Sequence, residues 1–428
     1  MTITTLEKRP LGSVASISST TLTQERGKRA INRYAMLDKA RALLIKHDVR
    51  SNTKTENSHR TRLCHAVKSH DADHVMIKLN KNEINSKASI GNVITCGSLW
   101  SCPVCASRIM VEKGERVANT IEAMELKGCI PVMVAFTAQH NIHTDLFEFK
   151  ERFKSAWKFF ASGRAWSNFK KRYGVVHYIV VREVTYGENG WHYHQHVLMF
   201  IDPTQFCSKV KSDDIQLELT ERWIYACHKN NLVAHSGAGL HVSTHKQASS
   251  EYLTKLGLAW TETGDLRHEL TNASSKKSIN IWDILTRAGL DTETDDLGRY
   301  ERLYLDYVQA LSGDNFMTFS HGLNDIIDAH IEKKSKESED AEQQDEKQEM
   351  QDWFAISDYW WRIVVWAKAY HEIIRVASET READRVIEKL YDLRFRLIRQ
   401  GKLSPDHFGK MKIRSYKGQL TDGYNPPS

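Results

Sequence analysis

The chain has 428 residues, enough for about three ordinary domains, and its 41% hydrophobic and 27% charged composition is normal for globular protein. It contains no apolar run of about 18 residues and no signal-peptide core near its start, so we expect a cytoplasmic protein without a membrane span. A net charge of +6 permits nucleic-acid binding, whereas seven cysteines are too sparse for the disulfide framework of a small secreted protein.

The N-terminal stretch of the chain is basic. Residues 1–70 hold 14 Lys and Arg residues against 5 Asp and Glu residues, and a helical pattern lies around residues 31–47. We therefore expect residues 1–89 to form a basic N-terminal arm that is partly disordered. A solvated surface helix is the alternative interpretation of this charge run.

Three cysteines crowd into ITCGSLWSCPVCASR, residues 94–108, as Cys96, Cys102 and Cys105. A C-x-x-C knuckle with a further cysteine nearby is typical of structural zinc, so residues 90–125 are predicted to be a zinc-binding segment. Cys64 is the first choice for the fourth ligand and His65 the second, while ordinary buried thiols are the alternative. The remaining cysteines stand alone and are expected in the core: Cys129, Cys207 and Cys227.

Residues 126–325 alternate between strand and helix patterns. Apolar and β-branched runs predict strands, and longer amphipathic stretches predict helices. The expected strands are 131–137, 175–184, 196–201 and 239–244, and the expected helices are 145–172, 214–227 and 248–256. This order predicts an α+β domain in which an antiparallel sheet is flanked by helices.

The strongest chemical signal is REVTYGENGWHYHQHVLMFI, residues 182–201, in which His192, His194 and His196 alternate. Alternate residues of a strand point to one face, so His194 and His196 are expected to project together. Glu183 lies on the preceding strand, and pairing across the YGENG turn brings its carboxylate beside them. Two imidazoles and a carboxylate predict a divalent-metal site, with His192 as a further ligand or a phosphate contact. A strand with surface histidines is the alternative.

A second signal is SSEYLTKLG, residues 249–257, where Tyr252 and Lys255 share one face of the predicted helix. A tyrosine phenol can attack a phosphodiester if a cation stabilises the charge that develops. Most tyrosines at such spacing only pack, so the motif gains meaning from its position after the histidine strand.

The end of the chain changes composition twice. Residues 331–352 hold nine acidic and four basic residues, so we assign residues 326–352 to an acidic linker or a solvated helix. Aromatic and aliphatic residues then recur at helical spacing, which predicts a helical C-terminal region over residues 353–428.

Together these motifs resemble the plasmid rolling-circle replication initiator (Rep) family, within the His-hydrophobe-His (HUH) superfamily of single-strand endonucleases. The resemblance covers roughly residues 90–325. CPVCASR resembles the family's cysteine motif, and VAFTAQHN, with Thr137, resembles a first motif near the DNA. REVTYGENGWHYHQHVLM and SSEYLTKLG resemble its metal and nucleophile motifs, and YVQALSGDNFMTFSHGL its closing segment.

The resemblance implies an HUH endonuclease with an RRM-like core that nicks one DNA strand at a plasmid origin. Tyr252 would form a 5′-phosphotyrosyl link and leave a 3′-OH primer, with Lys255 neutralising charge. Implied cofactors are Mg or Mn at Glu183, His194 and His196, and structural Zn. Implied partners are single-stranded and origin DNA, contacted by Thr137 and the basic terminal segments, and the host replication polymerase and helicase.

Two features depart from the family pattern. Gln195, between the two histidines, is not a hydrophobe, although it should point away from the metal. Only one tyrosine lies on the nucleophile helix, because position 248 is alanine, so the second cut needs either a second subunit, as in a homodimer, or an activated water with Glu251 as base. An HUH transposase or relaxase, a non-catalytic zinc-dependent DNA-binding regulator and a metallo-hydrolase are the competing interpretations.

Overall fold

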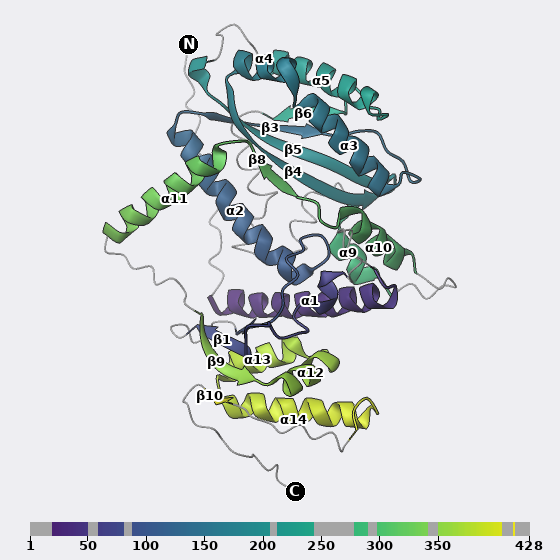
Figure 1. The fold of residues 1–428 in the computed structure, drawn as a ribbon, viewed down its shortest axis with the longest axis vertical. Helices are drawn as coiled ribbons and strands as arrows, with labels where there is room; N and C mark the ends of the chain where they lie inside the picture. The colour runs from purple at the N-terminus through teal and green to yellow at the C-terminus, as the bar shows by residue number, and fades with distance from the viewer. Residues whose placement is uncertain are drawn as a thin grey trace, which may run out of the picture.

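A computed structural model describes most of the chain, namely residues 19–49, 59–80, 88–205, 212–243, 278–289, 298–340, 350–404 and 414–415. These ranges contain two antiparallel sheets, each with its own hydrophobic core (Figure 1). No helix within them combines the length and apolar character that a membrane span requires.

The larger sheet carries the histidine strand. Its strands run in the order β6-β3-β5-β4-β7, with β8 pairing β4, and every pairing is antiparallel. The bounds are β3 Ile130–Phe136, β4 Val175–Gly187, β5 Gly190–Ile201, β6 Leu240–Ser243, β7 Ser278–Ile279 and β8 Met317–Phe319. The predicted antiparallel sheet with flanking helices is therefore confirmed.

Helices cover both sides of this sheet (Figure 1). Above it in that view lie α3 (Leu146–Phe160), α4 (Gly163–Tyr173) and α5 (Ser212–Lys229), and below it lies α2 (Pro103–Leu126). Further helices are α9 (Ile281–Arg287), α10 (Arg299–Leu311) and α11 (Leu323–Asp340), and α11 packs along α2 through an Arg116–Asp328 ion pair of 2.9 Å.

Aromatic rings join α3 and α5 to the sheet. The ring of Phe136 on β3 lies 5.1 Å from the rings of both Phe160 and Trp223, and that of Phe153 lies 5.1 Å from Tyr193 on β5. These contacts define the face of the sheet that the helices cover and shield from water. The single helix predicted over residues 145–172 is wrong, because the chain turns at Gly163 in the left-handed conformation (φ 72°) and separates α3 from α4.

The smaller sheet joins segments from distant parts of the sequence. Its order is β10-β9-β1-β2, with β1 Val75–Asn80, β2 Ser89–Gly91, β9 Met350–Ile356 and β10 Arg414–Ser415. Helices α12 (Asp358–Trp366), α13 (Tyr370–Thr380) and α14 (Ala383–Arg399) pack around it, with Ile77, Phe354, Trp361 and Leu390 in the core. Part of the expected N-terminal arm thus packs with the C-terminal helices.

Helix α1 (Ser19–Lys46) lies between the two cores (Figure 1). Leu44 belongs to the core of the larger sheet, whereas Leu37 belongs to the core of the smaller one, and both are fully buried. Short 3₁₀ turns occur at Arg60–Leu63 and Pro203–Gln205. The described basic stretch therefore connects the two halves of the molecule.

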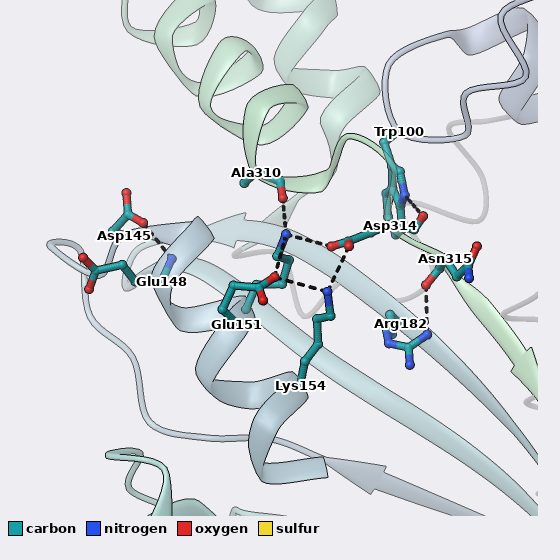
Figure 2. Close-up of polar contacts among 10 residues, drawn as sticks. Trp100, Asp145, Glu148, Glu151, Lys154, Arg182, Ala310, Asp314 and Asn315 are labelled. Atoms are coloured by element: carbon teal, nitrogen blue, oxygen red, sulfur yellow. Dashed lines mark hydrogen bonds and ion pairs between the residues drawn. The ribbon is translucent and has the colours of Figure 1, made fainter. Parts of the chain in front are cut away.

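A buried lysine anchors α3 to the segment that precedes β8. Lys150 is only 3% exposed, and its ammonium lies 2.8 Å from Asp314 Oδ2 and also donates to the Ala310 carbonyl. Lys154 approaches the other Asp314 oxygen at 3.0 Å (Figure 2). Asp314 therefore balances two cations, one of which has little access to water.

We predict that Asp314→Ala lowers the free energy of unfolding by about 1.5–3 kcal/mol, because the buried Lys150 ammonium loses its nearer carboxylate and keeps only that of the half-exposed Glu151, 3.2 Å away. The control is Asp358→Ala, which removes an exposed pair with Arg362 and should cost about 0.3–0.5 kcal/mol. Urea unfolding followed by circular dichroism measures both. Equal losses in the two variants would contradict a special role for Asp314.

Candidate functional site

The β4–β5 hairpin brings a carboxylate and two imidazoles together. In its register Glu183 lies opposite His194, and Val181 lies opposite His196. Because residues 194 and 196 alternate along β5, their side chains share a face with Glu183. The predicted projection of both histidines beside Glu183 is confirmed by the geometry.

Their ligand atoms converge. Glu183 Oε2 lies 2.9 Å from His194 Nε2 and 3.4 Å from His196 Nε2, and the atoms of the three residues all lie within 4.8 Å of one another. We call Glu183, His194 and His196 the carboxylate–histidine group. One carboxylate oxygen and two imidazole nitrogens thus converge on one position. This donor set fits a divalent cation that keeps open coordination positions.

The three side chains of the carboxylate–histidine group differ in how far they are exposed to solvent. The His194 and His196 side chains are 11% and 9% exposed, whereas that of Glu183 is 40% exposed. Burial raises the pKa of Glu183, but the two adjacent imidazoles outweigh this effect and hold its pKa well below the ordinary value. Glu183 is therefore an anion at neutral pH, and the site is open on its side.

His192 lies next to the carboxylate–histidine group and is not one of its convergent members. Its ring stacks on His194 at 4.5 Å and on His140 at 5.0 Å. Burial and the neighbouring His194 lower the pKa of His192 to about 4, so its ring is neutral at pH 7. Sequence reasoning missed His140, although the antiparallel register of β3 with β5 carries residues beyond Phe136 towards His192.

Gln195 and Thr137 occupy structural positions. Gln195 is 1% exposed and pairs with Phe136, whose ring contacts α5, so it lies on the face opposite the carboxylate–histidine group, as expected. The Thr137 hydroxyl donates to the Ala238 carbonyl at 2.6 Å, and the Thr137 carbonyl accepts from Trp223 Nε1 at 2.7 Å. Thr137 thus fastens the end of β3 to the segment that leads into β6.

The predicted nucleophile helix lies outside the described residues. Description stops at Ser243, the end of β6, and resumes at Ser278, the start of β7. Tyr252, Lys255 and Glu251 fall between these points, and their roles stay predictions.

Four cysteines form a second candidate metal site, which we call the four-cysteine cluster: Cys64, Cys96, Cys102 and Cys105. Three Sγ–Sγ distances, from Cys64 to Cys102 and Cys105 and from Cys96 to Cys105, are all 3.6 Å, and no disulfide joins them. A tetrahedral ion with sulfur ligands at about 2.3 Å sets its sulfurs about 3.8 Å apart. The observed spacing fits such an ion.

Backbone N–H groups point at the sulfurs of the four-cysteine cluster. The backbone N–H groups of Cys96, Ser98 and Cys105 each donate to a cysteine sulfur at 3.4 Å. Hydrogen bonds from the other cysteines, Cys102 first, lower the pKa of Cys105, whereas burial raises the pKa of Cys102. Cys64 is the fourth member, as preferred, whereas the adjacent His65 instead forms a hydrogen bond between its Nδ1 and the Tyr34 hydroxyl, 3.4 Å apart.

A short chain segment links the two candidate metal sites (Figure 2). Trp100, in the loop between Cys96 and Cys102, donates from Nε1 to the Asp314 carbonyl at 2.8 Å. The next carbonyls accept from Arg182: Asn315 from Nη1 and Phe316 from the backbone N–H, both at 2.8 Å. Because Arg182 precedes Glu183, the cysteine loop is fastened to the strand that carries Glu183.

Comparison with known proteins finds two distant similarities. The chain is 28% identical over 137 residues to a Streptomyces lividans protein named Protein rep, covering 26% of this chain and 30% of that protein. It is 24% identical over 165 residues to a Neomycin resistance protein of Streptomyces cyanogenus, covering 31% and 38%. The matches thus span less than two fifths of either relative. No family profile matches the chain, and no solved structure matches it.

We predict that Mn²⁺, used as a probe, binds the wild type and loses more than about 100-fold in affinity in His194→Ala and His196→Ala, because each removes a direct ligand. His192→Ala should cost about tenfold at most, because its ring only stacks on a ligand. The matched control is His241→Ala, an exposed histidine on β6. Calorimetric titration measures the affinities, and a larger loss in His192→Ala than in His194→Ala would contradict the assigned ligands.

Proposed function

We propose that the chain is a plasmid replication initiator that nicks one DNA strand at an origin by tyrosine transesterification. The carboxylate–histidine group carries the proposal, since it offers two buried imidazoles and a half-exposed carboxylate on one face of an antiparallel sheet. The distant similarity to the protein named Protein rep supports a role in replication. The sequence resemblance of residues 249–257 to a nucleophile motif supports the reaction type.

The donor set suits a hard divalent cation. Carboxylate oxygen with imidazole nitrogen and open positions accommodates Mg²⁺ or Mn²⁺, which when bound polarises a phosphodiester. Glu183, His194 and His196 would hold it, and the exposed side of Glu183 leaves room for a phosphate oxygen. Gln195 and Tyr193 lie on the opposite, covered face, so the strand of DNA is excluded from that side.

The nucleophile is the Tyr252 phenol. Its oxygen forms a bond to the scissile phosphorus, the bond from phosphorus to the 3′-oxygen breaks, and that oxygen leaves as a 3′-OH after taking a proton. The products are a 5′-phosphotyrosyl link and a primer end, which a host polymerase extends while a helicase separates the strands. A free phenol with a pKa of about 10 is barely ionised at neutral pH, so the Lys255 ammonium assists by stabilising negative charge.

Release of the displaced strand needs a second cut. Glu251, next to Tyr252, is our candidate base for a water that hydrolyses the second phosphodiester. The alternative is Tyr252 of a second copy of the chain, which would make the working unit a homodimer.

The four-cysteine cluster would hold a structural zinc ion. Four buried thiols at tetrahedral spacing leave no open position for substrate, which is the pattern of a structural site. Trp100 fastens this loop to Asp314, so an ordered cluster contributes to the placement of Arg182 and Glu183.

We predict about one tightly bound zinc ion per chain in the purified wild type, because a closed thiolate site contributes folding energy directly. Cys102→Ser should lose the zinc and aggregate. Cys129→Ser, which changes a buried cysteine outside the cluster, should keep both zinc and solubility. Elemental analysis by mass spectrometry measures the metal, and a soluble wild type without zinc would contradict the assignment.

The nicking reaction is tested with the supercoiled plasmid whose replicon encodes this chain. We predict that the wild type with Mn²⁺ nicks one strand and forms a covalent adduct on a denaturing gel. Tyr252→Phe lacks the attacking oxygen, so it should still shift single-stranded DNA but give less than about a thousandth of the nicked product. Tyr225→Phe, at an exposed tyrosine on α5, is the matched control and should act like the wild type.

Adduct formation by Tyr252→Phe would show another nucleophile, and wild-type binding without nicking would favour a non-catalytic regulator.

A further inference from the structure

One face of α5 is covered by no other described element. Four exposed side chains of this helix lie four residues apart, and we call them the α5 ridge: Leu217, Glu221, Tyr225 and Lys229. The opposite side of the helix is buried against the sheet through residues such as Trp223. In Figure 1, α5 lies at the outer edge of the molecule, with no described element beyond it. Nothing in the proposed reaction uses the α5 ridge.

The α5 ridge exposes large apolar side chains to solvent. Leu217 is 60% exposed and Tyr225 is 54% exposed. Phe159, near the end of α3, is 46% exposed and lies beside Tyr225, with the two ring centroids 5.7 Å apart. Two half-exposed aromatic rings in contact form an apolar surface, and a partner that covered this surface would gain free energy from its burial. Aromatic side chains are enriched in protein–protein interfaces for this reason.

The charges of the α5 ridge are placed symmetrically about Tyr225. Glu221 lies four residues before it and Lys229 four residues after it, which is about 6 Å to either side along a helix. The Lys229 ammonium lies 5.4 Å from the centre of the Tyr225 ring. Within the described part of the chain, neither Glu221 nor Lys229 forms an ion pair. One negative and one positive charge of the ridge are therefore available to a partner.

This arrangement makes the α5 ridge complementary to itself. If two copies of α5 pack antiparallel across a two-fold axis at Tyr225, Glu221 of each copy faces Lys229 of the other, and the two Tyr225 rings meet at the axis. Parallel copies would instead set like charges against each other. Rows of residues four apart are also the ridges through which helices commonly pack. The ridge therefore fits a second copy of this chain better than it fits a uniformly acidic or uniformly basic partner.

We propose that two copies of the chain form a dimer through the α5 ridge, with Phe159 beside it. Trp223 packs α5 onto Phe136, on the face of the sheet opposite the carboxylate–histidine group. The dimer therefore leaves both carboxylate–histidine groups facing away from the interface, so each can receive a phosphate of its own. The inference concerns association alone and does not depend on whether the chain nicks DNA.

The test is the mass of the full chain in solution, measured without DNA by sedimentation equilibrium at about 1–100 μM. We expect the wild type to approach twice the 49.3 kDa of one chain as its concentration rises. Glu221→Lys and Lys229→Glu should each weaken the dimer at least about tenfold, because each sets two pairs of like charges across the axis. The variant that carries both substitutions restores both pairs and should dimerise within about threefold of the wild type.

Matched variants control for charge and for the loss of an aromatic ring. Glu332→Lys and Lys336→Glu make the same charge changes at exposed positions of α11 and should leave the dimer unchanged. Tyr225→Ala removes the ring at the axis and should weaken the dimer at least about tenfold, whereas Tyr225→Phe keeps the ring and should dimerise like the wild type. Trp366→Ala, at an exposed aromatic residue on α12, should also dimerise like the wild type.

Recovery of the dimer when both charges are exchanged supports antiparallel pairing, because two unrelated defects would add instead of cancelling. A wild type that stays monomeric over the whole concentration range would overturn the proposal and leave the α5 ridge to a different protein partner. A dimer that is unaffected by Glu221→Lys, or one that both substitutions together fail to restore, would show that the copies meet elsewhere or in another orientation and would overturn it as well.

Discussion

The antiparallel pairing of β4 with β5 is the interaction on which the candidate site depends. It sets Glu183 opposite His194, and a slip of one residue would turn the carboxylate to the other face of the sheet. Gly190 at the start of β5 helps to fix this pairing, because it adopts φ 83° and a Cβ there would lie 2.8 Å from the Asn141 carbonyl oxygen. The segment after β3 therefore closes directly onto the hairpin, which also places His140 against His192.

The rest of the fold holds this hairpin in place from three directions. The aromatic layer of α3 and α5 covers the face away from Glu183, and Lys150 and Lys154 fasten α3 to Asp314. The same segment binds Arg182 on β4 and Trp100 in the cysteine loop. The four-cysteine cluster thus helps to position the carboxylate–histidine group, although its buried sulfurs are not accessible to a substrate. Loss of the cluster should therefore disturb the hairpin as well as the local loop.

Local patterns predicted how Glu183, His194 and His196 are arranged, but they did not predict the long-range pairings of the fold. Strand alternation identified His194 and His196, and the short turn before Gly190 implied the pairing with Glu183. The sequence could not decide between Cys64 and His65 as the fourth ligand, because both lie in a loop that has no periodic pattern. The structure places Cys64 in the cluster. The pairing of β1 with β9 could not be predicted, because no local signal relates strands so far apart in the sequence. Tyr252 stays a prediction from the sequence.

In the proposed reaction, a cation at the carboxylate–histidine group and the phenol of Tyr252 act on the same phosphate. The most direct measurement is peptide mapping by mass spectrometry after incubation with origin DNA and Mn²⁺, followed by nuclease and trypsin digestion. Trypsin cleaves after Lys246 and Lys255, so residues 247–255 form one peptide, QASSEYLTK, with a single tyrosine. We expect a nucleotide adduct on this peptide with Mn²⁺ and none in EDTA or in His194→Ala. An adduct on any other peptide, or one that forms in EDTA, would contradict it.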